Sequence, residues 1–197
     1  MEIALASSSA TRATLLRNAG VSLSILRVSV DEDAIRLSLG AENAAPQDVA
    51  DTIAEFKARR GAAQHSGLPV LGCDQILEIQ GNILAKPATR QEAFTQLQTL
   101  QGQTHRLLSA AVLYEDNVPT WRVTGQARLT LHALTDDEID AYLTQAWPDV
   151  SGSLGAYHAE GYGARLFSRI DGDWFTVMGM PLLDICSFLR LRGWLDP

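Results

Sequence analysis

The stretch that decides the fold is Val70-Leu71-Gly72-Cys73-Asp74-Gln75-Ile76-Leu77, an apolar run between Pro69 and Gly81 that carries a single carboxylate. A run of this kind, bounded by proline and glycine, predicts a buried β-strand. An ionised aspartate is almost never buried in a strand without a cation or a metal as its partner. Asp74 is therefore the first candidate for a functional residue.

Strands and helices alternate on both sides of this stretch. The apolar patterns predict further strands over residues 3–6, 21–30, 83–84, 106–114, 121–132 and 164–170. Helices are predicted over residues 11–18, 46–64, 89–100, 136–145 and 182–190, and Thr89 and Thr135 are the expected caps of two of them. A glycine-rich loop is expected over residues 151–163. This alternation predicts an α/β fold.

Composition limits the functions that the chain can have. Its 197 residues, 46% of them hydrophobic, suffice for one domain with a substantial core. The net charge of −7 argues against binding to a nucleic-acid backbone. The two distant cysteines, Cys73 and Cys186, predict reduced thiols, and neither a signal peptide nor a membrane span is expected. These features together predict a cytoplasmic protein with no membrane partner.

Charged side chains gather near the ends of the predicted elements. The acids are Asp31, Glu32, Asp33 and Asp74, and the bases are Arg12, Lys57 and Lys86. Carboxylates with lysine and arginine, and without a cysteine ligand set, suit a hard cation such as Mg²⁺ and a phosphate-bearing substrate. The serine-rich turn 7–9 lies between a strand and a helix, where backbone N–H groups can face an anion.

Seven blocks of the chain resemble the Maf family of nucleoside triphosphate pyrophosphatases, in the order in which the family has them. They are LASSSATRATLL (5–16), VDE (30–32), AEFKA (54–58), GCDQ (72–75), KP (86–87), GAYHAEG (155–161) and VMGMPL (177–182). Each block alone is weak, but their joint occurrence over nearly the whole chain is highly specific. The resemblance implies a single domain over residues 1–197.

The family resemblance implies a fold and an activity. The fold would be an elongated mixed sheet with flanking helices and two lobes around a cleft, as in inosine triphosphate pyrophosphatase. The enzyme would hydrolyse a nucleoside triphosphate between the α and β phosphates with a divalent cation, Mg²⁺ or Mn²⁺, and would commonly be a homodimer.

The resemblance also implies roles for individual residues. Asp74 would be the proton acceptor, and Glu32 would bind the metal together with Asp74. Lys86 and Lys57 would neutralise phosphate charge, and Arg12 would hold a phosphate through its guanidinium fork. Substrate would also contact the serines of the N-terminal turn, Ser7 and Ser9.

Each role competes with a simpler interpretation. Asp74 could cap a strand end, and Arg12 could be a surface arginine. Ser9 could cap a helix without contacting the substrate. Lys57 follows Phe56 on helix 46–64, where Phe56 is expected on the apolar face and Lys57 on the polar one. Arg12 and Lys86 are expected to be exposed, so replacing either by alanine should weaken triphosphate binding and turnover while leaving stability nearly unchanged.

Residues 75 and 160 bear on the choice of base. Gln75 and Glu160 stand where the branch acting on thymidine and uridine triphosphates has threonine and glutamine, and they resemble the branch that prefers 7-methylguanosine triphosphate. A carboxylate can accept from guanine N–H groups and favours a cationic methylated base. The alternative for Glu160 is a solvated loop acid. Ala10 and Thr11 depart from the family's proline and arginine, which predicts a looser phosphate loop.

Three other functions stay open at this stage. The enzyme could prefer thymidine or uridine triphosphate, or it could remove only the terminal phosphate. The family name also suggests a nucleotide-sensing regulator of septum formation, although a sensor would not need the acid that activates water.

Overall fold

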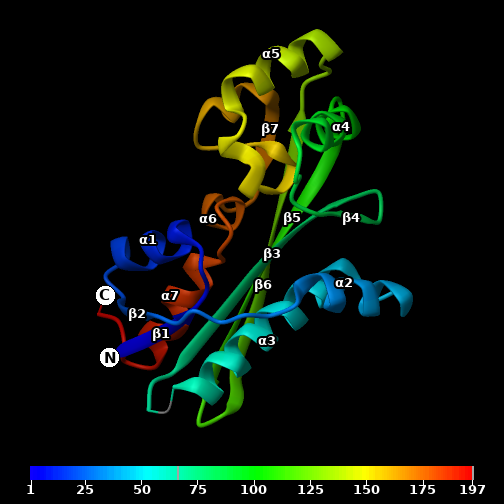
Figure 1. Cartoon of the computed structure of the whole chain (residues 1–197). Coiled ribbons are helices and arrows are strands. Elements are labelled where there is room, and N and C mark those ends of the chain that lie inside the picture. The colour runs from blue at the N-terminus through cyan, green and yellow to red at the C-terminus, as the bar shows by residue number, and fades with distance from the viewer. Residues whose placement is uncertain (66, 197) are drawn as a thin grey trace. The chain divides into compact units, whose positions relative to one another are not determined.

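The computed structural model describes residues 1–65 and 67–196, and its strands form one seven-stranded mixed sheet (Figure 1). The strands are β1 (Glu2–Ala6), β2 (Ser22–Ile25), β3 (Val70–Ile79), β4 (Asn82–Leu84), β5 (Thr104–Glu115), β6 (Val118–Leu131) and β7 (Phe167–Asp171). They are ordered β2-β1-β3-β5-β6-β7, and β4 pairs with β3. The predicted α/β class with a mixed sheet is confirmed.

Helices connect these strands. The α-helices are α1 (Ala10–Asn18), α2 (Glu32–Ala41), α3 (Pro46–Gln64), α4 (Arg90–Leu100), α5 (Asp136–Ala146), α6 (Trp174–Val177) and α7 (Leu182–Leu191). Three short 3-10 helices, η1 (Asp149–Gly152), η2 (Leu154–Ala156) and η3 (Tyr162–Leu166), occupy most of the predicted glycine-rich loop. None of the helices in the described part of the chain combines the length and the apolar character needed to cross a bilayer.

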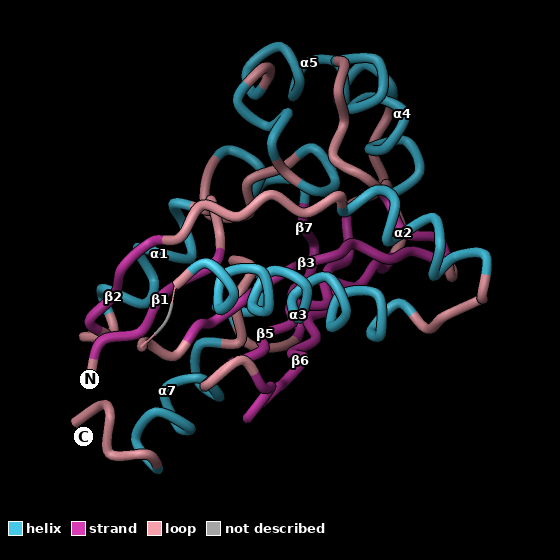
Figure 2. Tube along the Cα trace, turned by 60° about the horizontal axis from the view of Figure 1, so that its bottom comes forward, coloured by secondary structure: helices cyan, strands magenta, loops and turns pink. Residues whose placement is uncertain are grey.

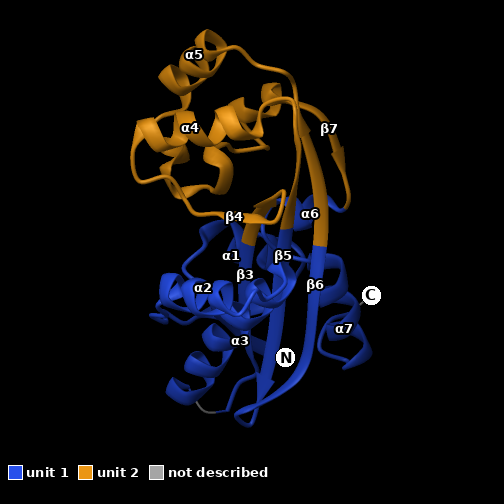
Figure 3. Ribbon diagram, turned by 90° about the vertical axis from the view of Figure 1, so that its right-hand side faces the viewer, with its two compact units in different colours: residues 1–75, 108–125, 173–197 blue, residues 76–107, 126–172 orange. Residues whose placement is uncertain are grey.

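The chain divides into two compact units (Figure 3). The first unit consists of residues 1–75, 108–125 and 173–197, and the second consists of residues 76–107 and 126–172. Strands β3, β5 and β6 contribute residues to both units. The two units correspond to the two expected lobes, whereas the cleft and the single domain over 1–197 stay predictions.

Parallel pairing organises the first unit. β1 pairs in parallel with β2 from Glu2↔Ser22 to Leu5↔Ile25, and with β3 from Ala4↔Val70 to Ala6↔Gly72. Parallel strands require crossover connections, which α1 provides between β1 and β2 and which α2 and α3 provide between β2 and β3. The last pair between β1 and β3 is Ala6↔Gly72. The serine turn 7–9 comes after this pair on the β1 side, and Asp74 comes two residues after it on the β3 side.

The sequence prediction was wrong about several elements. The strand expected over 21–30 ends at Ile25, because Leu5↔Ile25 is its last pair with β1. Residues 32–41, for which no element was predicted, form α2, with Asp31 capping the backbone N–H of Ala34 at 3.0 Å. The strand expected over 164–170 starts only at Phe167, because η3 occupies residues 162–166.

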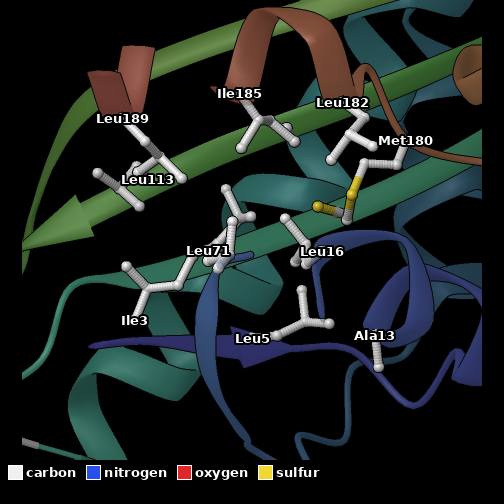
Figure 4. Packing of buried hydrophobic residues seen from close by; sticks show 13 residues of the cluster. Ile3, Leu5, Ala13, Leu16, Leu71, Leu113, Met180, Leu182, Ile185 and Leu189 are labelled. Carbon is white, nitrogen blue, oxygen red and sulfur yellow. The ribbon is translucent and has the colours of Figure 1, made fainter. Parts of the chain in front are cut away.

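Successive side chains of β3 point to opposite faces of the sheet in the first unit. Leu71 and Cys73 belong to a buried apolar cluster with residues of β1, α1 and α7, several of which are labelled in Figure 4. Gly72 lies on the opposite face against α3, which runs alongside the strands in Figure 2. A Cβ at Gly72 would collide with the backbone of Ala54 and Ala58, so only glycine allows this close approach. Asp74 shares the α3 face with Gly72.

Candidate functional site

Asp74 is buried at the point where β3 leaves its pairing with β1. Its side chain is only 5% exposed, and its Oδ1 accepts a hydrogen bond from Lys57 Nζ at 2.7 Å. Its Oδ2 is buried and has no hydrogen-bond partner among the described residues. The predicted cation partner of this buried carboxylate is confirmed, and one oxygen of the carboxylate is left to bind a ligand.

Lys57 joins Asp74 to a second carboxylate. Its Nζ also lies 2.7 Å from Glu32 Oε1, so one ammonium group bridges two acids. Lys57 belongs to the buried face of α3 and its side chain is 11% exposed, whereas Phe56 is 38% exposed. The expectation that Lys57 lies on a polar face and Phe56 on the apolar one was therefore wrong, because α3 turns its small residues toward the sheet.

Glu32 reaches Lys57 because α2 begins at this residue. Its other oxygen, Oε2, accepts from Arg36 Nη2 at 3.0 Å, one helical turn further on. Burial raises the pKa of Glu32, but the neighbouring Lys57 and Arg36 outweigh it and leave this pKa below its ordinary value. Arg36 was missed from the sequence because α2 was missed. The Asp31 cap and the acidic first turn were the signals that could have revealed the helix.

The serine turn lies around Arg12. Ser9 caps α1 by accepting from the backbone N–H of Arg12 at 3.3 Å, as the simpler interpretation of this serine predicted. The Ser7 hydroxyl accepts from Arg12 Nη1 at 3.3 Å. Arg12 also donates from Nη1 to the carbonyl of Cys73 and from Nε to the carbonyl of Gly179, both at 2.8 Å. One strand, β3, and two turns of the first unit thus provide the partners of one guanidinium group.

Arg12 is 9% exposed, so the expectation of an exposed arginine at a helix end was wrong. Within its own unit, no described carboxylate lies within ion-pair distance of it, and the protein groups use Nε and Nη1. A buried guanidinium without an anionic partner is unfavourable. The arrangement therefore favours an anion as a ligand, bound through Nη2.

Gln75 lies on the other face of β3 from Asp74. Its Nε2 is within hydrogen-bond distance of the Ser109 hydroxyl at 3.1 Å, of the Thr176 carbonyl at 3.0 Å and of the Val177 carbonyl at 3.1 Å. The turn 176–179 therefore contacts both Gln75 and Arg12. Ser109 was not singled out from the sequence, and the block 177–182 was named there for the family resemblance alone, without a role in the site.

Lys86 and Glu160 belong to the second unit, and both are exposed. Lys86 follows β4, and Glu160 lies in a turn in which Gly161 N–H donates to the carbonyl of His158 at 3.1 Å. The structure brings seven predicted site residues together in the first unit: Ser7, Ser9, Arg12, Glu32, Lys57, Asp74 and Gln75. The other two predicted site residues, Lys86 and Glu160, belong to the second unit.

The two carboxylates fit a divalent cation. Mg²⁺ is commonly held by one or two carboxylates together with substrate phosphates and water. Asp74 and Glu32 share a lysine at 2.7 Å, and Asp74 Oδ2 lacks a partner among the described residues. Within those residues no three acidic, histidine or cysteine side chains form a complete protein cage. The donor set therefore suits a cation that is completed by its substrate.

Comparison with known proteins agrees with this geometry. A family model described as Maf-like protein matches residues 2–192. The chain is 56% identical over 193 residues, 98% of both chains, to a protein of Jannaschia sp. (strain CCS1) named nucleoside triphosphate pyrophosphatase 1. It is 48% identical to the nucleoside triphosphate pyrophosphatase of Ruegeria pomeroyi, covering 98% of this chain and 96% of the relative.

A further relative bears on the nucleotide. The chain is 39% identical over 196 residues to a Brucella abortus protein named 7-methyl-GTP pyrophosphatase, covering 100% of this chain and 98% of that one. A family model and relatives that span almost the whole sequence leave one assignment: the chain belongs to the Maf family.

Proposed function

We propose that this protein is a nucleoside triphosphate pyrophosphatase that hydrolyses the bond between the α and β phosphates, giving the monophosphate and pyrophosphate. The observation that carries the proposal is the buried Asp74 carboxylate, which Lys57 holds at Oδ1 and which has a free Oδ2 among the described residues. The names of the relatives at 56% and 48% identity support the same activity.

Asp74 is the proposed general base. Its Oδ2 takes a proton from a water molecule, and the oxygen of that water forms a bond to the α phosphorus. The bond from this phosphorus to the bridging oxygen breaks, and its electron pair leaves with pyrophosphate. Lys57 orients Asp74 through the 2.7 Å contact to Oδ1, which leaves Oδ2 to accept the proton.

The cationic side chains bind the triphosphate. Arg12 offers Nη2 to a phosphate oxygen, since Nε and Nη1 are held by carbonyl groups and by Ser7. Ser7 and Ser9 support this arginine, and Lys86 of the second unit neutralises further phosphate charge. Phosphoryl transfer depends mainly on such positioning and charge neutralisation.

Glu32 would hold a divalent cation, Mg²⁺ or Mn²⁺, beside Asp74, whose Oδ2 is the oxygen that takes the proton. The bound cation supplies charge neutralisation at the phosphate oxygens and lowers the pKa of bound water. Lys57, which lies 2.7 Å from both acids, keeps the carboxylate pair compensated before substrate and cation arrive.

The preferred base in this proposal is 7-methylguanine. Gln75 and Glu160 are the residues that favour it over thymine or uracil, because a carboxylate accepts from guanine N–H groups and attracts a cationic base. The Brucella abortus relative, named 7-methyl-GTP pyrophosphatase, supports this choice.

A panel of nucleotides tests the activity. Purified protein is incubated with Mg²⁺ or Mn²⁺ and with 7-methyl-GTP, GTP, UTP and dTTP, and pyrophosphate and orthophosphate are measured separately. Pyrophosphate release from 7-methyl-GTP is the expected result. Orthophosphate as the product would assign removal of the terminal phosphate instead, and no turnover of any nucleotide would favour a sensor.

Two further expectations follow from family membership. We expect a homodimer, which sedimentation or light scattering of the purified protein checks, and we expect a cytoplasmic location, which cell fractionation checks. Neither expectation enters the mechanism above.

A further inference from the structure

Ser109 is a completely buried hydroxyl on β5, in the first unit. Its Oγ donates to the carbonyl of Thr176 at 2.8 Å and lies 3.1 Å from Gln75 Nε2. Because its hydrogen is used on the carbonyl, the oxygen is available to accept from the Gln75 amide. Ser109 therefore links Gln75 to the turn 176–179.

The surroundings of Gln75 fix which end of its amide points where. Two of the three oxygens around Nε2, those of Thr176 and Val177, are backbone carbonyls and can only accept. Exchanging the nitrogen and the oxygen of the amide would place Oε1 against these carbonyls, which is repulsive. The amide nitrogen is thus committed to protein groups, and Oε1 faces away from them.

Oε1 lies on the side of Arg12. A Cβ placed at Gly179 would be 3.5 Å from Gln75 Oε1 and 3.5 Å from Arg12 Nε. Gly179 has a φ of +100°, which other residues adopt only with strain. A side chain at position 179 would therefore contact both Gln75 Oε1 and Arg12, and within this unit no described residue donates a hydrogen bond to Oε1.

We propose that Ser109 is a positioning residue for base selection: it holds Gln75 so that only the acceptor Oε1 is offered to the substrate. This inference rests on the proposed function of Gln75 in the choice of base. An acceptor held in one direction matches guanine, whose N1–H and amino group are neighbouring donors. It matches uracil and thymine less well, because their single imino N–H is flanked by two carbonyl oxygens.

Ser109→Ala tests the proposal with little change in volume. The amide of Gln75 then keeps its two carbonyl partners but loses the third, so its orientation loosens. We expect the ratio of kcat/KM for 7-methyl-GTP to kcat/KM for UTP to fall about fivefold, the effect of one hydrogen bond. Ser24→Ala is the matched control, because Ser24 Oγ is buried on β2 and has no partner among the described residues.

A double-variant cycle shows whether Ser109 acts through Gln75. Gln75→Thr alone should lower the same ratio, and adding Ser109→Ala to Gln75→Thr should lower it no further. A purely structural role for Ser109 would instead reduce kcat/KM for both nucleotides by the same factor, in either background. Ser109→Cys, with a weaker acceptor, should give an intermediate ratio and replaces Ser109→Ala if that variant does not fold.

The outcomes separate this inference from the function on which it rests. If Gln75→Thr changes the ratio but Ser109→Ala and Ser109→Cys do not, the role of Ser109 is overturned and that of Gln75 stands. Equal losses for both nucleotides, or an additive effect in the Gln75→Thr background, also overturn it. If Gln75→Thr leaves the ratio unchanged, the proposed choice of base fails and the role of Ser109 fails with it.

Discussion

At the scale of single residues, burial separates acids that look alike in the sequence. Asp33 follows Glu32 directly, but its side chain is 91% exposed and pairs only with Arg36 at 3.1 Å. Asp74 is buried against Lys57 and keeps Oδ2 without a partner among the described residues. A carboxylate that is desolvated and held on one side is suited to accept a proton on the other.

We expect Asp74→Asn to lower kcat for the best substrate by about 10²- to 10⁴-fold, because a neutral amide cannot act as the base. Circular dichroism should show the same secondary structure as in the wild type. Asp33→Asn is the matched control and should keep nearly full activity. Turnover of Asp74→Asn at close to the wild-type rate would remove Asp74 from the mechanism.

Arg12→Ala should destabilise the protein. The substitution leaves the carbonyls of Cys73 and Gly179 without their donor, and each buried group left unpaired costs about 1–3 kcal/mol. Lys86→Ala is the comparison, and it should change the free energy of unfolding by about 0–1 kcal/mol because Lys86 is exposed. Urea denaturation measures both values, and equal stability of the two variants would contradict the burial of Arg12.

At the scale of elements, α2 contributes to the site through its first residue and α3 through a residue near its middle. α2 contributes its first residue, Glu32, to the site, and Glu32 contacts Lys57 of α3 at 2.7 Å. The bounds of α3 were predicted as 46–64 and are confirmed. The burial of Lys57 could not be predicted, because α3 packs on β3 through Ala54, Ala58 and Gly72, and only the partner strand determines which helical face it covers.

The lowered pKa of Glu32 predicts a dependence of stability on pH. A carboxyl group whose folded pKa lies below its ordinary value of 4.5 stabilises the folded state above that pH, and this contribution is lost as pH falls through the folded value. The difference in unfolding free energy between wild type and Glu32→Gln should therefore shrink on acidification below about pH 4.5. Urea titrations from pH 7 to pH 3 measure it, and a difference that grows toward low pH would contradict the sign.

The loop that carries Glu160 is held by two buried tyrosines of the second unit. Tyr157 Oη lies 2.6 Å from His105 Nε2, and Tyr142 donates to the carbonyl of Ala156 at 3.2 Å. Burial lowers the pKa of His105 to about 4 although Glu78 raises it, so this imidazole is neutral at pH 7 and can accept from Tyr157. The bond to Tyr157 therefore gives His105 a structural role in the second unit.

Tyr157→Phe should therefore lower the free energy of unfolding by about 1–3 kcal/mol, because it leaves a ring nitrogen of the buried His105 unpaired. Tyr162→Phe is the matched control. It removes a hydroxyl from a residue that is 46% exposed and bonded only to Arg165 among the described residues, and it should have little effect. Equal thermal unfolding of the two variants would show that the His105 contact contributes no stability.

At the scale of the whole molecule, the sequence predicted the order of helices and strands better than the contacts between residues that are far apart in the sequence. Asp74 was predicted to be buried from its own strand, because an apolar run shows burial directly. Cys73 was predicted to be a reduced thiol, and it is free and buried, with burial raising its pKa to about 11. Ser109 could not be found, because its importance arises only where it contacts Gln75, and the block 177–182 was recognised only as part of the family resemblance, without a role in the site.

The final prediction concerns the metal and the stability of the whole protein. Lys57 offsets part of the negative charge of Asp74 and Glu32 in the absence of any metal, so removing the proposed cation with EDTA should abolish turnover while leaving the melting temperature nearly unchanged. Lys57→Met removes this compensation and leaves two close carboxylates that repel each other. That variant should melt at a lower temperature and should be stabilised by added Mg²⁺ more than the wild type, because a ligand that binds only the folded state stabilises it. Thermal melts with EDTA, Mg²⁺ and Ca²⁺ measure this difference.

Lys86→Met is the control, since it removes a lysine that does not belong to the carboxylate pair, and it should respond to Mg²⁺ as the wild type does. An equal response of Lys57→Met and Lys86→Met would show that Asp74 and Glu32 do not form the cation site.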